Sequence, residues 1–213
     1  MSIEAPAHVI FVPGLYWNLP GIGEHSRQAN NTETVDALQA ALGRLAVVEL
    51  HDANFHGEGT PEGKEEALDL RIKDITEQTG RPVRVAGSSL GGNLAFGATL
   101  RLGPDVVSRG LAVSAPLRPT GSPPPGLRLK DNDDATFIES TRKRLDEAQP
   151  EDLTRLKTVY GAHDIFVKPA WSQWEGIDAH AVPGFWHPNI IKRILGNREL
   201  MQAILLGPQL PKE

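Results

Sequence analysis

The 213-residue chain has no cysteine, no long apolar run and no excess of basic side chains. The missing cysteine excludes disulfide bonds, thiol nucleophiles and thiolate metal ligands. A formal net charge of −5 gives no support to binding of nucleic acid or an anionic membrane surface. No apolar stretch reaches the roughly 20 residues of a membrane-spanning helix. Any chemistry must therefore come from oxygen and nitrogen side chains.

No targeting signal is predicted from the sequence either. The first residues, MSIEAPAHVIFVPG, lack a basic start and a small-residue cleavage site, so a signal peptide is not predicted and we expect a cytoplasmic protein. A hydrophobic content of 39%, with 21 glycines, is typical of globular proteins. The length fits one domain over residues 1–213, and neither a repeat nor an interdomain linker interrupts it.

Strand-like and helix-like segments alternate along the chain. Short, continuously apolar segments predict strands at 8–12, 45–50, 83–86, 110–115, 156–160 and 177–182. Helical spacing and end signals predict helices from 32 onwards and at 64–79, 90–102, 133–148, 169–175 and 189–206, with a loop at 15–31. Strands that are apolar on both faces and alternate with helices predict an α/β fold with a mostly parallel sheet between two helical layers.

The most informative segment is Gly87-Ser88-Ser89-Leu90-Gly91, between the third strand and the helix after it. A Gly-x-Ser-x-Gly sequence in that context is a nucleophile elbow, a turn so tight that both glycine positions must lack a side chain. The hydroxyl of Ser89 would stand above the sheet at a helix N-terminus, where developing negative charge is favoured. The alternative is a plain strand-to-helix turn in which the serine caps the helix.

A serine nucleophile needs a base, and the base needs a carboxylate to orient it. Asp164 follows the fifth predicted strand and His187 follows the sixth, so both fall in loops at the carboxyl edge of the sheet, where ligands bind. Asp164 could instead close an Asx turn. His163 and His180 are the competing bases, but His163 shares the loop of the aspartate and His180 falls inside a strand, where a satisfied buried histidine is expected. Asp178 starts that strand and so points to the other edge.

The order Ser89, Asp164, His187 resembles that of the α/β-hydrolase superfamily, and the likeness covers nearly the whole chain. The segment 52–60, DANFHGEGT, is similar to the loop after the family's fourth strand, and 12–15, VPGL, to its oxyanion loop. Pro13 departs from the histidine that many members carry. The short N-terminus leaves no room for the family's first two strands. A reduced, capless α/β/α sandwich of about six strands is implied.

The resemblance implies acyl transfer on carboxylic esters or thioesters by a small serine esterase that needs no cofactor. Ser89 would attack the carbonyl, His187 would move the proton and Asp164 would hold the imidazole. The backbone N–H groups of Leu15 and Leu90 would bind the oxyanion. The alternative is a non-catalytic binding or scaffold protein that kept the fold. Either could be a monomer or a homodimer.

Several other features allow two interpretations. Tyr16, Trp17 and Trp186 adjoin the predicted chemistry and could bind substrate, whereas Trp171 and Trp174 are expected to pack loops onto the sheet. The region 116–155, with its helix at 133–148, is either an ordinary crossover, which we favour, or a small lid. The polar residues His51, Asp52 and His56 could be read as metal ligands, but nothing in their spacing makes them converge, so no metal is expected.

Overall fold

The computed structural model of the chain describes residues 5–14, 24–53, 55, 59–118, 132–184 and 186–207. Within these residues, every strand pairing is parallel, and the strands form one sheet of order β2-β1-β3-β4-β5-β6. The strands are β1 (Ala7–Val12), β2 (Ala46–Leu50), β3 (Val83–Ser88), β4 (Val107–Val113), β5 (Leu156–Gly161) and β6 (Asp178–Val182). The predicted parallel sheet is confirmed. β4 starts three residues earlier than predicted, because Val107 already pairs with Val83.

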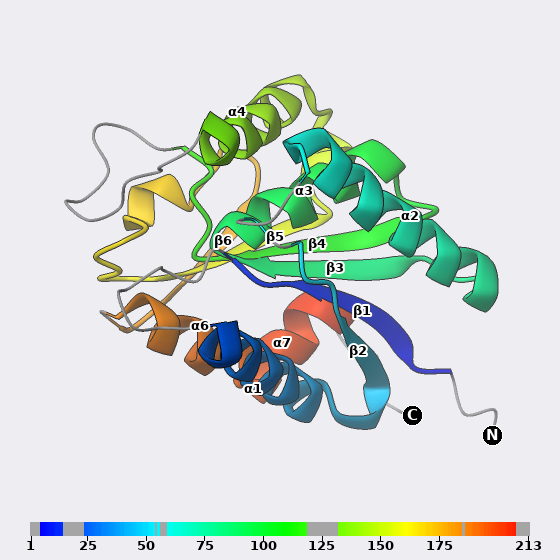
Figure 1. Ribbon diagram of the computed structural model, residues 1–213, viewed down its shortest axis with the longest axis horizontal. Helices are drawn as coiled ribbons and strands as arrows, with labels where there is room; N and C mark the ends of the chain where they lie inside the picture. The colour runs from blue at the N-terminus through cyan, green and yellow to red at the C-terminus, as the bar shows by residue number, and fades with distance from the viewer. Residues whose placement is uncertain are drawn as a thin grey trace.

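Helices cover both faces of the sheet, which gives the predicted three layers (Figure 1). The helical segments are α1 (Glu24–Leu42), η1 (Gly43–Leu45), α2 (Pro61–Thr79), α3 (Leu90–Leu102), α4 (Asn132–Glu147), α5 (Pro150–Leu153), η2 (Pro169–Trp171), α6 (His187–Leu195), α7 (Arg198–Met201) and the π-helical turn η3 (Gln202–Leu206). One layer holds α2, α3 and α4, and the other holds α1, α6 and α7. This arrangement leaves the carboxyl ends of the strands at one edge, on the left of Figure 1.

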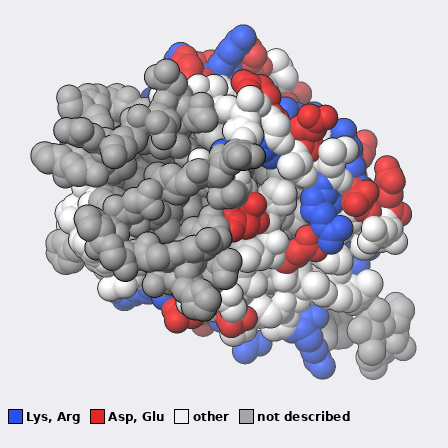
Figure 2. All heavy atoms as spheres, viewed as in Figure 1, with Lys and Arg blue, Asp and Glu red and all other residues white. Residues whose placement is uncertain are grey.

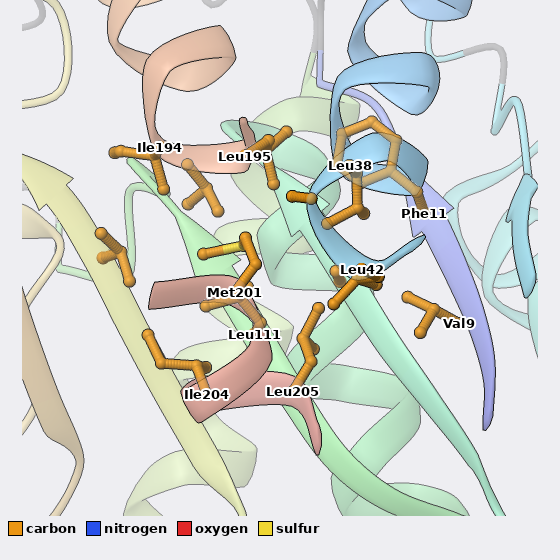
Figure 3. Close-up of a cluster of buried hydrophobic side chains, with 14 of the residues drawn as sticks. Val9, Phe11, Leu38, Leu42, Leu111, Ile194, Leu195, Met201, Ile204 and Leu205 are labelled. Atoms are coloured by element: carbon orange, nitrogen blue, oxygen red, sulfur yellow. The ribbon is translucent and has the colours of Figure 1, made fainter. Parts of the chain in front are cut away.

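Strand β1 shows why the sheet needs helices on both sides. Val9 and Phe11 are fully buried in the core formed with α1, α6 and α7, which Figure 3 shows in close-up. Ile10 and Val12 are fully buried on the opposite face, against α2 and α3. Alternate side chains of one strand therefore anchor both helical layers, since successive residues of a strand point to opposite faces.

Helix α4 packs on α3 as part of the outer layer. Phe137 and Ile138 lie in the core that α2 and α3 share with the sheet, and the Thr141 hydroxyl donates to the carbonyl of Asn93. Charged side chains of both signs intermix over α2 and α4 in Figure 2. The guanidinium of Arg144 on α4 binds Glu65 of α2 through two hydrogen bonds of 2.7 and 2.8 Å. These contacts tie α4 firmly to the body of the protein.

The first and last helices differ from the sequence prediction. Helix α1 begins at Glu24, well inside the segment 15–31 that was predicted as a loop; residues 15–23 lie outside the described part of the chain. Asparagine favours helix ends over helix interiors, yet Asn30 lies within α1, where it accepts a hydrogen bond from Lys192 of α6. Tertiary contact thus overrides local propensity.

The predicted helix 189–206 is divided into α6, α7 and η3. The break falls at Asn197, whose side-chain oxygen accepts from the N–H of Leu200 and so starts a new helix. The predicted short helix 169–175 is a single turn, η2, and α5 is a turn that the sequence did not predict. Among the described helices, none combines the length and hydrophobicity required to cross a membrane.

Candidate active site

The turn between β3 and α3 has an unusual backbone at Ser89. Its φ of 50° and ψ of −126° are unfavourable for a residue with a side chain. A Cβ on Gly87 would lie 2.1 Å from the carbonyl oxygen of Gly91, and one on Gly91 would lie 2.2 Å from that of Val12. Both positions therefore exclude any side chain, as the tight turn was predicted to require. The turn presents Ser89 at the carboxyl end of β3 and the start of α3.

The segment after β1 lies directly against this turn. A Cβ on Gly14 would come within 2.5 Å of both the Ser89 Cβ and the Ser88 carbonyl oxygen, and within 3.3 Å of the Leu90 nitrogen. The N–H of Gly14 donates to the buried hydroxyl of Ser88 at 3.2 Å. The carboxyl end of β1 is thus in contact with the side chain of Ser89 and with the first peptide group of α3.

Asp164 and His187 form a buried pair at the same edge of the sheet. The carboxylate oxygen Oδ2 of Asp164 lies 2.6 Å from Nδ1 of His187, and the two side chains are 0% and 4% exposed. The other oxygen, Oδ1, accepts from the N–H groups of Phe166 and Val167. Asp164 therefore does both things the sequence suggested: one oxygen closes an Asx turn and the other holds the imidazole.

Helix α6 places His187 beside this carboxylate. His187 is the first residue of α6, with Pro188 in the first turn, two residues before the predicted start. One turn further on, Ile190 fills the space that a side chain on Gly161 or Gly184 would occupy, with distances of 2.5 and 2.6 Å from the would-be Cβ atoms. The N–H of His163 donates to the carbonyl of Gly184. The loops after β5 and β6 are thereby fastened together.

The second ring nitrogen of His187 is not engaged. Its Nε2 is buried and has no hydrogen-bond partner among the described residues, so it is not bonded to the Ser89 hydroxyl in this structure. The structure brings together the carboxylate and the histidine that were predicted to act as a pair, and it puts Ser89 at the same end of the sheet, but no hydrogen bond joins His187 to Ser89. In enzymes without substrate, this contact is often long and tightens on binding.

The competing residues occupy different surroundings. His180 was expected to be buried, and this is wrong: its side chain is 41% exposed and contacts Asp178 at 3.3 Å. The reason is that β6 is an edge strand, so its side chains are only partly covered. His163 is exposed in the loop that carries Asp164. Asp178 starts β6, at the end away from Ser89, as predicted.

Aromatic side chains flank the Asp164–His187 pair. Trp186 is 47% exposed, and its ring meets that of Phe166 edge to face at 5.1 Å between centroids. The ring of Phe166 lies 6.2 Å from that of His187. Sequence reasoning did not select Phe166; its position two residues after Asp164, in the loop turned by that carboxylate, was the available signal. Trp171 and Trp174 are buried, as expected. Leu15, Tyr16, Trp17 and His56 lie outside the described residues.

No group of three or more histidine, aspartate or glutamate side chains within the described ranges is arranged to hold a metal ion. His51 follows β2 at the carboxyl edge of the sheet, and burial lowers its pKa below the ordinary value. That shift favours the neutral imidazole.

Comparison with known proteins gives matches to solved structures alone. No family model matches the chain, and no curated protein matches it. A lipase from Bacillus licheniformis, BlEst2, superposes with a TM-score of 0.67 at 16% identity, over 97% of this chain and 94% of that one. A monoacylglycerol lipase from Paleococcus ferrophilus has a TM-score of 0.61 at 17% identity, over 95% and 94%. An α/β-hydrolase enzyme from a sediment metagenome of the Mar Chica lagoon, Morocco, has a TM-score of 0.53 at 15% identity, over 93% and 89%.

The chain has the α/β-hydrolase fold. The resemblance noted in the sequence is thus confirmed at the level of the fold, across nearly the full length of these structures. Within the described residues, the α/β-hydrolase fold appears here with six parallel strands, the reduced form that was predicted. At identities of 15–17%, the likeness to these structures shows the fold alone.

Proposed function

We propose that the protein is a serine hydrolase that cleaves carboxylic esters or thioesters of small to medium acyl groups. The observation that carries the proposal is the buried 2.6 Å contact between Asp164 and His187, at the sheet edge where Ser89 stands in a strained turn. A buried carboxylate that receives two backbone N–H groups and one imidazole nitrogen is held in place on every side. That arrangement engages Nδ1 and leaves Nε2 as the ring nitrogen that can act as a base.

In the proposed mechanism, Nε2 of His187 removes the proton of Ser89 as its Oγ attacks the ester carbonyl. Asp164 keeps Nδ1 protonated and stabilises the imidazolium that forms. The Leu90 N–H, at the start of α3, donates to the oxyanion; the Leu15 N–H is the second donor that we propose, outside the described residues. His187 then protonates the departing alcohol or thiol. A water molecule that it activates hydrolyses the acyl-enzyme and restores the serine.

The surroundings of the pair suggest where the substrate binds. Trp186 and Phe166 present an apolar, partly exposed wall beside His187, suited to the acyl or alcohol part of an ester. Tyr16 and Trp17 are further proposed contacts, in the part of the chain that is not described. We assign 133–148 to an ordinary crossover rather than a lid, because α4 is fixed to α2 and α3 by buried side chains and ion pairs.

Covalent labelling tests the proposal. A fluorophosphonate probe should label the wild-type protein, and Ser89→Ala should lose both the label and ester turnover. Ser108→Ala is the matched control, because Ser108 lies in β4 near the opposite edge, where its hydroxyl binds the Val83 carbonyl. Esters of graded acyl length would define the substrate. A label that survives Ser89→Ala would contradict the assignment of the nucleophile.

A non-catalytic binding protein is the second candidate. The observation in its favour is that no hydrogen bond joins His187 to Ser89 among the described residues. A wild-type protein that takes up no probe and turns over no simple ester, yet binds esters or acids, would support this candidate. The intact Asp164–His187 pair argues against it, because a site without turnover has no need to bury and orient an imidazole.

A further inference from the structure

We propose that Ser88, the residue before the proposed nucleophile, is a positioning residue that clamps the end of β1 onto the turn at Ser89. The inference rests on the proposed function, because the clamp acts on the groups that would carry out the chemistry. Ser88 is 1% exposed, and its Oγ accepts the N–H of Gly14, 74 residues earlier in the chain. From the sequence alone, Ser88 was expected only to pack or to form a local hydrogen bond, since it is in the wrong register of the Gly-x-Ser-x-Gly pattern.

The hydrogen bond determines how close Gly14 comes to the reacting groups. A Cβ on Gly14 would lie 2.5 Å from the Ser88 carbonyl oxygen and from the Ser89 Cβ, and 3.3 Å from the Leu90 nitrogen. Gly14 therefore lies close to both the proposed nucleophile and the proposed oxyanion donor. Its backbone limits where the Ser89 side chain can point. Without the acceptor at Ser88, the Gly14 N–H would need another partner, and the segment would move to find one.

A second set of contacts shows that all of residues 12–14, and not Gly14 alone, lies close to the turn at Ser89. A Cβ on Gly91 would lie 2.2 Å from the Val12 carbonyl oxygen and 2.6 Å from that of Pro13. The end of β1 thus lies against the first turn of α3 from Val12 to Gly14. Backbone packing brings the two segments together, and the Ser88 hydroxyl supplies a directional bond that fixes their relative position.

The expected consequence is a loss of rate with little loss of substrate affinity. Removing the Ser88 hydroxyl leaves Ser89, Asp164 and His187 in the protein but loosens the backbone that sets the geometry of attack. A displacement of about 1 Å in such a site can cost on the order of 100-fold in rate. Since the clamp touches the reacting centre and not the aromatic wall at Trp186, KM should change little.

The test compares Ser88→Ala and Ser88→Thr with the wild type. Ser88→Ala should lower kcat for a simple ester by about 10- to 100-fold and weaken inhibition by a boronic acid, which mimics the tetrahedral oxyanion, by a similar factor. KM should stay within about threefold. Ser88→Thr keeps the hydroxyl and should restore most of the rate. Ser172→Ala is the matched control, a fully buried serine whose Oγ has no partner among the described residues.

The outcomes distinguish a positioning role of Ser88 from a purely structural one. Wild-type kcat in Ser88→Ala would overturn the clamp, and so would equal losses in Ser88→Ala and Ser88→Thr. A loss of rate that matches a loss of folded protein in thermal unfolding would show that the serine is only structural. Gly14→Ala, which forces the segments apart, should lose more rate than Ser88→Ala. If Ser89→Ala keeps its turnover, the proposed function fails together with the clamp, whereas failure at Ser88 alone leaves the proposed function standing.

Discussion

Two histidine–aspartate pairs lie at the two ends of strand β6, and they differ in almost everything but their chemistry. At the start of the strand, His180 contacts Asp178 at 3.3 Å, with side chains 41% and 52% exposed. Beyond its end, His187 contacts Asp164 at 2.6 Å, with side chains 4% and 0% exposed. The first pair joins residues two apart in sequence, and the second joins the loop after β5 to the first residue of α6.

The difference shows what turns a common ion pair into a candidate catalytic site. Water competes for the exposed pair and leaves its geometry free to vary, so it contributes little to stability or function. The buried pair is shielded from water, and two backbone N–H groups fix the carboxylate. A buried polar pair of this kind must be satisfied to persist, and the contact with Asp164 engages Nδ1 of His187 and leaves Nε2 without a partner among the described residues.

The largest expected effect is the difference in kcat between variants of the two histidines, His187 and His180. We expect His187→Ala to lower kcat for ester hydrolysis by about 10⁴-fold or more, because the serine loses its base. His180→Ala, the matched control, should stay within about twofold of the wild type. Steady-state kinetics on one ester measures both. Comparable losses in the two variants, or none in His187→Ala, would remove the distinction between the pairs.

Substitution of the two aspartates, Asp164 and Asp178, should change kcat by nearly as different amounts. In Asp164→Asn, the amide oxygen can still accept from the Phe166 N–H, but the amide nitrogen then faces Nδ1 of His187 and favours the wrong tautomer. We expect a fall in kcat of roughly 10³- to 10⁴-fold with the fold retained. Asp178→Asn should leave kcat unchanged. A burst of probe labelling at the wild-type rate in Asp164→Asn would argue that Asp164 only closes its loop.

A third comparison concerns Trp174, which precedes β6 in the sequence, and Trp186, which follows it: one substitution should change stability and the other substrate affinity. Trp186→Ala should raise KM for longer acyl esters by roughly tenfold and leave stability nearly unchanged, since its ring is 47% exposed. Trp174→Ala should lower the free energy of unfolding by about 3–5 kcal/mol, because that ring is buried in the core beside α3. Kinetics and urea unfolding on both variants test this. A large loss of stability in Trp186→Ala would reassign it to packing.

Sequence reasoning worked where position in the fold follows from local pattern. The tight turn at Ser89 and the positions of Asp164 and His187 after β5 and β6 follow from strand ends and glycine spacing, and a parallel sheet then places all of them at its carboxyl end, although His187 begins α6 rather than lying in a loop. It failed where tertiary contact decides. Nothing in the sequence around His180 indicates that β6 is the outermost strand of the sheet, and this position is what leaves the side chain of His180 exposed.

Contacts between segments distant in the sequence could not be predicted either. The bond from Gly14 to Ser88 spans 74 residues, and neither residue suggests the other. Lys192 of α6 likewise donates to Asn30, 162 residues earlier, in the part of α1 that was predicted as a loop. Such pairings are set by how the layers pack, so a single sequence without coordinates does not reveal them.

The smallest effect concerns the exposed pair and depends on pH. A hydrogen bond from Lys157, with further attraction from that ammonium and from His180, lowers the pKa of Asp178 below its ordinary value of about 4. The ionised carboxylate therefore stabilises the folded protein above that ordinary value, and the contribution disappears as the pH falls through the lowered pKa. Because the side chain is 52% exposed, solvent screening keeps the contribution below about 1 kcal/mol. Asp178→Asn should thus unfold at slightly lower urea than wild type at pH 7, with the gap closing toward pH 3. A gap that widens on acidification would show that the pair opposes folding.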